Sequence, residues 1–126
     1  MKQVIYTKEA PEPIGPYSQA IIAGNMLFLS GQVAIDPDSN ELIVGGISQE
    51  TEQVMKNIEK LLKQSGYSFS EVVKTTIFLS DMRHFADVNK VYGSFFKGDF
   101  PARETVAVLG LPKNANVEIS VTAYKA

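Results

Sequence analysis

Apolar and polar side chains alternate along Asn116-Val117-Glu118-Ile119-Ser120-Val121-Thr122-Ala123-Tyr124, close to the end of the chain. Because successive side chains of a β-strand point to opposite faces of its sheet, the four apolar residues between 117 and 123 share one face. The polar residues share the other face. This period of two predicts a strand that buries one side in a core and carries Glu118 on the other.

Further strands and two helices are predicted on the N-terminal side of this strand. A β-branched run over Val72–Leu79 predicts a central strand. Shorter strands are expected over residues 2–6, 17–23, 26–30 and about 104–109, with a turn at Gly24-Asn25 and a polar loop over 36–40. One helix is expected from an N-cap at Ser48 to a stop at Gly66, with the apolar stripe Val54, Met55, Ile58, Leu61 and Leu62. The second is expected between Asp81 and Gly98, with the stripe Phe85, Val88, Tyr92, Phe95 and Phe96.

The order of these elements predicts an α+β fold, in which a mixed sheet carries two helices packed on one face. No repeat or linker divides the chain, so we expect a single domain over residues 1–126. The uncovered face of the sheet is polar on the last strand but apolar elsewhere. Such a face usually meets a partner chain, and a homo-oligomer is therefore expected.

Composition excludes several classes of site. The chain has 126 residues, a net charge of -2, no cysteine and one histidine, His84. Thiolate chemistry and disulfides are excluded, and a metal site would need to be built almost wholly from carboxylates. Two arginines and scattered lysines form no basic stripe, which argues against a nucleic-acid binder. No apolar run suits a signal peptide or a membrane span, so a cytoplasmic protein without membrane contact is expected.

Two charged residues are candidates for chemistry. Arg103 lies between Phe100-Pro101 and a strand, where its rigid guanidinium could hold a carboxylate through two parallel hydrogen bonds. The alternative is a solvated charge or an ion pair with Glu104. Glu118 could transfer a proton through a water molecule, whereas the alternative is a solvent-facing carboxylate paired with a lysine.

Four uncharged residues are weaker candidates. Tyr17 follows the stiff Gly15-Pro16 turn and could form the wall of a small site, although core packing fits equally well. Gly31 could let backbone approach a ligand, and a strand end explains it too. Ser30 has no evident base to activate it as a nucleophile. Asn89, at the edge of an apolar stripe, is expected to hydrogen-bond nearby backbone or a ligand.

Four ordered segments together resemble the RidA/YjgF family of reactive enamine/imine deaminases. The segments are Ile14-Gly15-Pro16-Tyr17-Ser18-Gln19-Ala20, Leu29-Ser30-Gly31-Gln32, Pro101-Ala102-Arg103, and Leu111-Pro112-Lys113 leading to Val117-Glu118-Ile119. Each is weak alone, but their joint occurrence in a chain of this length is specific. The resemblance extends over nearly the whole chain.

The resemblance implies a chorismate-mutase-like fold, a homotrimer, and sites in clefts between subunits. It implies hydrolysis of 2-aminoacrylate and 2-aminocrotonate, released by pyridoxal-phosphate-dependent dehydratases, to 2-keto acids and ammonia without metal or organic cofactor. On this resemblance Arg103 binds the substrate carboxylate and Glu118 positions water. Tyr17, Ser30, Gly31 and Asn89 match positions near the family's site.

One departure and one rival function qualify the resemblance. The family often has Pro-Ala-Arg-Ser-Cys, whereas this chain has Glu104 and Thr105 after Arg103. Thr105 cannot act as a thiolate, but by alternation it shares the side of Arg103 and is expected near the ligand, while Glu104 should face away.

The rival function is that of a regulator that binds small 2-keto acids without turnover. Ribonuclease and chorismate mutase activities are disfavoured by the charge balance and the small number of arginines.

Overall fold

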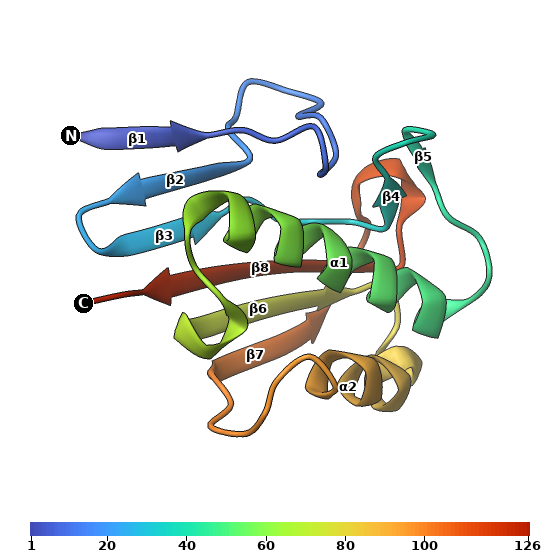
Figure 1. Ribbon diagram of the computed structural model, residues 1–126. Helices are drawn as coiled ribbons and strands as arrows, with labels where there is room; N and C mark the ends of the chain where they lie inside the picture. Colours follow the sequence, from blue (N-terminus) through green and yellow to red (C-terminus); the bar gives the residue numbers. More distant parts are fainter.

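The computed structural model describes residues 1–126, and it places both helices on one side of a twisted sheet (Figure 1). The main sheet has six strands in the order β1-β2-β3-β8-β6-β7. They are β1 (Lys2–Ile5), β2 (Ala20–Ala23), β3 (Met26–Leu29), β8 (Val117–Tyr124), β6 (Val72–Leu79) and β7 (Ala102–Ala107). All neighbours are antiparallel except β6 and β7, which are parallel and joined through α2 (Phe85–Gly93). The predicted α+β architecture is confirmed.

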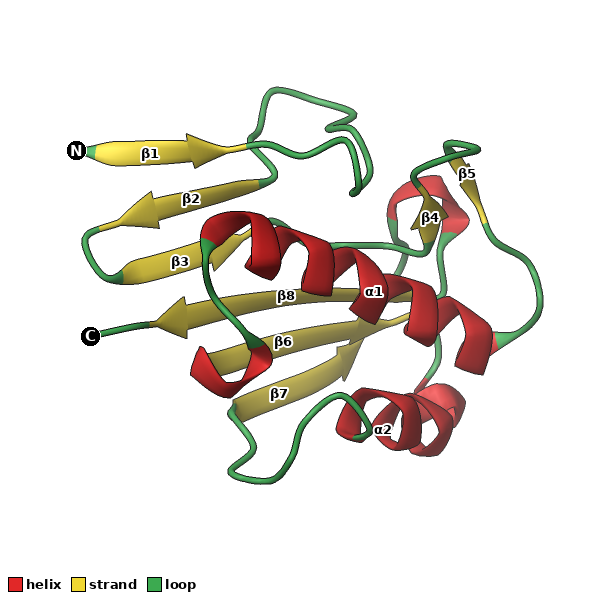
Figure 2. Cartoon of the chain, viewed as in Figure 1, coloured by secondary structure: helices red, strands yellow, loops and turns green.

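β8 lies inside the sheet, between β3 and β6, and its predicted alternation is confirmed. Val117, Ile119, Val121 and Ala123 are buried against the helices, whereas Glu118 and its polar neighbours point to the opposite face. The helix α1 (Ile47–Ser65) covers this core with the predicted stripe (Figure 2). Alternation in β8 thus separates an apolar face under the helices from a polar face that carries Glu118.

The ends of α1 differ from the prediction on one side only. Gly66 closes the helix in the left-handed conformation at φ 82°, as expected for a glycine stop. The N-cap, however, is Gly46 rather than Ser48, because the Gly46 carbonyl accepts the first helical bond from the Glu50 amide at 3.0 Å. Ser48 therefore lies within the first turn.

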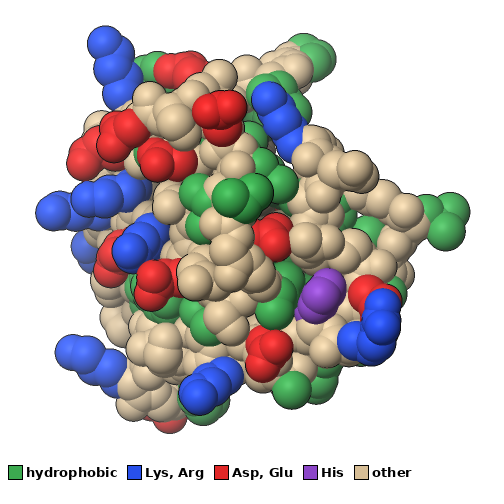
Figure 3. All heavy atoms as spheres, turned by 90° about the vertical axis from the view of Figure 1, so that its right-hand side faces the viewer, with side chains coloured by type: hydrophobic (Ala, Val, Ile, Leu, Met, Phe, Trp, Pro, Cys, Tyr) green, Lys and Arg blue, Asp and Glu red, His purple; other side chains and the backbone are tan.

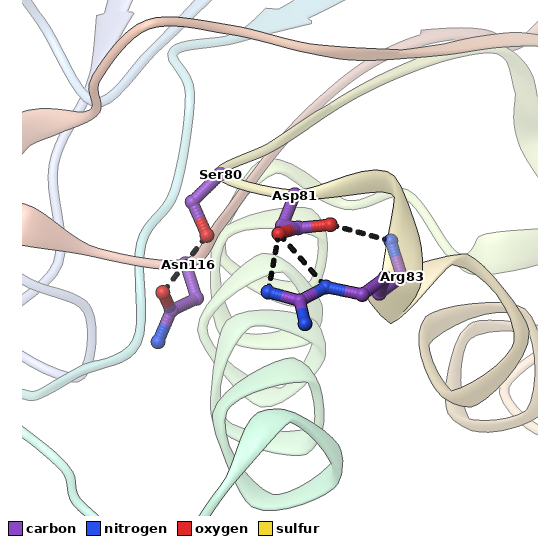
Figure 4. Close-up of polar contacts among 4 residues, drawn as sticks. All are labelled: Ser80, Asp81, Arg83 and Asn116. Atoms are coloured by element: carbon purple, nitrogen blue, oxygen red, sulfur yellow. Dashed lines mark hydrogen bonds and ion pairs between the residues drawn. The ribbon is translucent and has the colours of Figure 1, made fainter.

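The second helix is shorter than its apolar stripe predicts. α2 ends at Gly93, and Phe95 and Phe96 follow it in tight turns, where both rings pack against Phe69. Asp81 is a cap as predicted, but it caps the short 3-10 helix Met82–His84 that precedes α2 (Figure 4). Its side chain accepts from the Arg83 amide at 2.8 Å, and hydrogen bonds from Arg83 lower the pKa of Asp81 to about 2.

Strand boundaries also differ from the prediction, and one small hairpin was not predicted. β2 begins at Ala20 rather than residue 17, although the Gln19 carbonyl still accepts a hydrogen bond from the Ser30 amide at 3.0 Å. β7 covers residues 102–107 rather than 104–109, in register with β6. The expected polar loop over 36–40 is the tip of a small hairpin formed by β4 (Ile35–Asp36) and β5 (Glu41–Leu42), in which Asn40 adopts φ 60°.

The face of the sheet opposite the helices is uncovered, as predicted. One row of paired residues crosses its full width: Val4, Ile21, Phe28, Thr122, Lys74 and Ala102. Phe28 is 45% exposed and Val4 is 58% exposed. Apolar side chains are therefore open to contact there. None of the helices has the length and hydrophobicity needed to cross a membrane.

Candidate functional site

Four of the residues singled out from the sequence meet in one cleft at the uncovered face. Tyr17, Ser30, Gly31 and Glu118 line a cavity of about 320 Å³. Its other walls are Glu12, Ile14, Val33, Ile35 and Pro112. The cleft joins the proline-rich loop, the end of β3 and the start of β8, which are far apart in the sequence.

Gly31 is needed here because the Glu118 side chain lies over it. A Cβ atom at Gly31 would lie 2.5 Å from Glu118 Oε2, closer than real Cβ contacts allow. The two segments are held together by the Gln32–Ile119 bridge, whose backbone hydrogen bonds measure 2.8 and 3.0 Å. The missing side chain therefore gives the carboxylate its place on the floor of the cleft.

The environment of Glu118 suits proton transfer. In the register of the sheet it lies opposite Phe78, which lies opposite Val106, so its row is otherwise apolar. Burial raises the pKa of the half-buried Glu118 carboxyl above its usual value. No lysine or arginine pairs with it, so its interpretation as a surface ion pair is wrong.

Tyr17 and Ser30 form the wall of the cleft and are both engaged with backbone. The Tyr17 hydroxyl accepts a hydrogen bond from the Ile14 amide at 3.2 Å, which closes the loop around Gly15 and Pro16. Ser30 Oγ donates to the Ser18 carbonyl at 2.6 Å. With its proton directed to a carbonyl, Ser30 is not arranged as a nucleophile, in agreement with the prediction.

Arg103 lies elsewhere, on the helix side of β7, and faces α2. Its Nη2 donates to Asn89 Oδ1 at 2.7 Å, and its guanidinium carbon lies 5.1 Å from the centre of the Tyr92 ring. These residues line a second cavity of about 280 Å³ together with Gly93, Phe100 and Pro101. Asn89 thus accepts its hydrogen bond from a side chain, so the expected bond between its side chain and nearby backbone is wrong.

The charge of Arg103 has no carboxylate partner. The expected alternative, an ion pair with Glu104, is wrong because Glu104 faces the opposite side of β7 and binds Lys74 and Thr76 there. Hydrogen bonds from Lys74 and Thr76 lower the pKa of Glu104. Arg103 is stabilised instead by Asn89 and by two aromatic rings, which leaves its positive charge available to an anion.

Thr105 shares the side of Arg103, as the alternation of β7 predicts. Its Oγ1 is buried and makes no hydrogen bond within the chain. A buried hydroxyl without a partner carries a desolvation penalty, so a ligand that bonds it would recover that cost.

The family model described as Endoribonuclease L-PSP matches residues 7–125. A RutC family protein of Pyrococcus horikoshii is 50% identical, covering 99% of both chains, and the human 2-iminobutanoate/2-iminopropanoate deaminase is 43% identical over 99% of this chain and 91% of its own. The chain also superimposes on YyfA of Yersinia pestis, described as a member of the conserved Rid protein family, with TM-score 0.96, 48% identity and coverage of 99% and 100%. The chain belongs to the Rid family. A further Rid-fold structure, Escherichia coli TdcF with bound serine, has TM-score 0.94 and 33% identity over 98% and 99% of the two chains.

In this Rid protein the two halves of the expected site are separated by the sheet. Glu118, Tyr17, Ser30 and Gly31 lie at the uncovered face, whereas the side chains of β7 that face α2 include Arg103. One Rid chain alone therefore does not bring the guanidinium to the carboxylate.

Two residues that line these cavities were not singled out as site candidates by the sequence analysis. Tyr92 was assigned only to the apolar stripe of α2, yet its ring also supports Arg103, and its hydroxyl donates to Thr75 Oγ1 at 2.9 Å. Burial raises the pKa of Tyr92, which keeps this hydroxyl a donor. Glu12 lines the cleft, and no helix or strand periodicity in its loop could have indicated this.

No group of three or more histidine, cysteine or carboxylate side chains is arranged to hold a metal ion. The surface also lacks a basic stripe on the side that carries the small hairpin and the N-terminal end of α1, where acidic and basic side chains are interspersed (Figure 3). The chemistry available at the two half-sites is that of two carboxylates, one guanidinium and several hydroxyl and amide groups.

Proposed function

We propose that this Rid protein is a cytoplasmic deaminase that hydrolyses 2-iminobutanoate and 2-iminopropanoate, the imines formed from 2-aminocrotonate and 2-aminoacrylate. The products are 2-ketobutyrate or pyruvate, and ammonia. The observation that carries the proposal is Glu118, a carboxylate with a raised pKa held over Gly31 in a cleft of small-molecule size. The deaminase name of the human relative supports the same activity.

The proposal includes a homotrimer of single Rid domains over residues 1–126, in the chorismate-mutase-like arrangement. The uncovered face would pack against the same face of neighbouring chains and bury exposed apolar residues such as Phe28. Arg103 of one subunit would then complete the cleft that contains Glu118 of the next. The separation of the two half-sites within one chain supports this arrangement, because neither half is sufficient alone.

The reaction needs only positioning and proton transfer. Arg103 holds the substrate carboxylate, and water adds to the imine carbon. Glu118 accepts a proton from that water and passes it to the imine nitrogen, which gives a carbinolamine. Glu118 then transfers the hydroxyl proton of the carbinolamine to the nitrogen, the carbonyl forms, the carbon–nitrogen bond breaks and ammonia leaves. Tyr17, Ser30 and Gly31 shape the wall, Asn89 orients Arg103, and Thr105 offers its unpaired hydroxyl to the ligand. Such contributions supply roughly 10²–10⁴-fold for the acid-base step, enough for a labile substrate.

The direct test generates 2-aminocrotonate with a threonine dehydratase and follows 2-ketobutyrate. Arg103→Ala and Glu118→Gln should each lose about 10²-fold or more of the activity. Mixing the two variants under refolding conditions tests the shared site, because only chains of opposite type can together supply Arg103 and Glu118. Random mixing should restore roughly a quarter of the wild-type sites. No recovery in mixtures shown to contain hybrid oligomers would place the site within one chain and contradict the proposal.

A second candidate is a regulator that binds small 2-keto or amino acids without turnover. The bound serine in TdcF supports ligand binding in a related protein. Calorimetric binding of 2-ketobutyrate, without any acceleration of imine hydrolysis, would favour this candidate. Ribonuclease activity, suggested by the name of the family model, is disfavoured because two carboxylates and no basic side chain line the cleft, which would repel phosphates.

A further inference from the structure

Glu12 is a second carboxylate in the cleft, and the proposed reaction does not use it. It lies between Pro11 and Pro13 and lines the same cavity as Glu118. Its Oε1 accepts a hydrogen bond from the Tyr6 hydroxyl, and this bond raises the pKa of Tyr6, so the tyrosine stays a donor. Its other oxygen has no partner within the chain, and no lysine or arginine pairs with it.

The loop that carries Glu12 is held in place by the buried side chain of Gln19. Gln19 is 2% exposed, and its side chain bonds four backbone groups of the loop: the Thr7 amide at 2.8 Å, the Thr7 carbonyl at 3.0 Å, the Ala10 carbonyl at 3.4 Å and the Pro11 carbonyl at 2.9 Å. The prolines on each side of Glu12 further restrict the backbone. Glu12 is therefore held at the cleft rather than carried on a mobile segment.

The other walls of the cleft suit a ligand longer than a three- or four-carbon imine. Ile14, Val33, Ile35 and Pro112 provide apolar surface, and no wall residue is a lysine or arginine. The volume of about 320 Å³ belongs to the range of pockets that take much larger ligands. A cleft that combines apolar walls with a carboxylate matches a methylene chain with a cation at its end.

We propose that Glu12 gives this cleft a preference for 2-imino acids whose side chain ends in a cation, such as the imine derived from arginine. The inference rests on the proposed deaminase function and specifies its substrate class. The reacting end is hydrolysed as before, with water adding to the imine carbon and ammonia leaving, while the cationic end lies at Glu12. An arginine-type amino acid has no leaving group on its β-carbon, so this imine must come from two-electron oxidation of the amine rather than from a dehydratase.

Arginine and citrulline provide a matched substrate pair, because guanidinium and urea have nearly the same shape but only the former is charged. An amino-acid oxidase, with catalase present to remove peroxide, generates both imines, and the rate of 2-keto acid formation is measured for each. The wild type should prefer the arginine-derived imine. In Glu12→Gln this preference should fall about five-fold, as expected for one solvent-accessible ion pair, with the citrulline-derived rate unchanged.

The control is Glu9→Gln in the same loop, since Glu9 pairs with Lys60 at 3.5 Å and does not line the cleft. It should leave the preference as in the wild type. An equal preference in wild type and Glu12→Gln, or the same loss in both variants, would overturn the inference. The two failures are distinguishable: if 2-aminocrotonate is hydrolysed normally and the preference is absent, only Glu12 is misassigned, whereas no hydrolysis of any imine contradicts the function itself.

Discussion

The two half-sites of this Rid protein differ in charge and in the face of the sheet on which they lie. The Glu118 half is an acidic cleft at the uncovered face, whereas the Arg103 half is a cationic pocket between β7 and α2. Within one chain neither charge has an ion-pair partner. A single chain therefore presents the two charges on different faces, so that only the proposed contact between subunits would bring both to one substrate.

The largest expected effect comes from removing the cationic half. Arg103→Ala should lower kcat/KM for 2-aminocrotonate by about 10²–10³-fold, because it removes charge-assisted hydrogen bonds to the substrate carboxylate. The chain offers a matched control in Arg83→Ala, since Arg83 is exposed and pairs only with Asp81. Steady-state kinetics of both variants checks the comparison, and equal rates would show that Arg103 has no such role.

Removing the acidic half should act on kcat. Glu118→Gln is expected to lower kcat by about 10²-fold with little change in KM, because it removes the proton acceptor. The wild-type kcat should fall as the pH decreases through the raised pKa of Glu118, whereas kcat of Glu118→Gln should not show this decrease. A lost rate with an unchanged pH profile would argue against proton transfer by Glu118.

The same substitution should not weaken the fold. A carboxyl whose folded-state pKa is raised costs folding free energy above that pKa, and the cost disappears as the pH falls below the unfolded value. Glu118→Gln should therefore keep or raise Tm at neutral pH. A clear decrease in Tm would mean that the lost rate reports unfolding.

A smaller effect is expected from the floor of the cleft. Gly31→Ala would place a Cβ atom 2.5 Å from Glu118 Oε2 and displace the carboxylate, which should lower kcat by about ten-fold. Gly110→Ala is the control, because nothing lies within 4 Å of its added atom. When Glu118 is already replaced by glutamine, Gly31→Ala should lower kcat little further. If the two substitutions lower kcat by fully additive free energies, Gly31 does not act through Glu118.

The smallest effect is expected at Thr105. Thr105→Val removes a buried hydroxyl without a partner, which should stabilise the free chain by about 1 kcal/mol in thermal or chemical unfolding. If this hydroxyl bonds the substrate, KM should rise about three-fold. Thr105→Ser retains the hydroxyl and should leave KM unchanged. If Thr105→Val has the same KM as the wild type, Thr105 does not bind the substrate.

Periodicity predicted most of the fold, because burial under two helices imposes a repeat on each element. The alternation of β8 and the stripe of α1 were both confirmed. The failures occur at the ends of elements, where few periodic residues remain to define a boundary. β2 starts three residues later than predicted, and α2 stops at Gly93 although its apolar stripe continues to Phe96.

The site was predictable to a different degree in its two halves. The candidate residues of both halves came from motifs, and the faces on which the structure places Arg103 and Glu118 followed from alternation in β7 and β8. The support of Arg103 by Tyr92 was not found, because a tyrosine in a helical stripe is indistinguishable from core. Glu12 was missed for another reason: its loop has no period, and its place at the cleft depends on the tertiary bonds of Gln19.

Gln19 and Glu12 have separate tasks within one short loop. The buried amide holds the loop in place, and the carboxylate at the loop's tip contacts only the Tyr6 hydroxyl and the cleft. A substitution at position 12 would remove only the bond from the Tyr6 hydroxyl, whereas a substitution of Gln19 would leave buried backbone groups of the loop without their partner. If Glu12 sets the substrate preference as proposed, position 12 is a place where the substrate range can be altered while the loop and the reaction are retained.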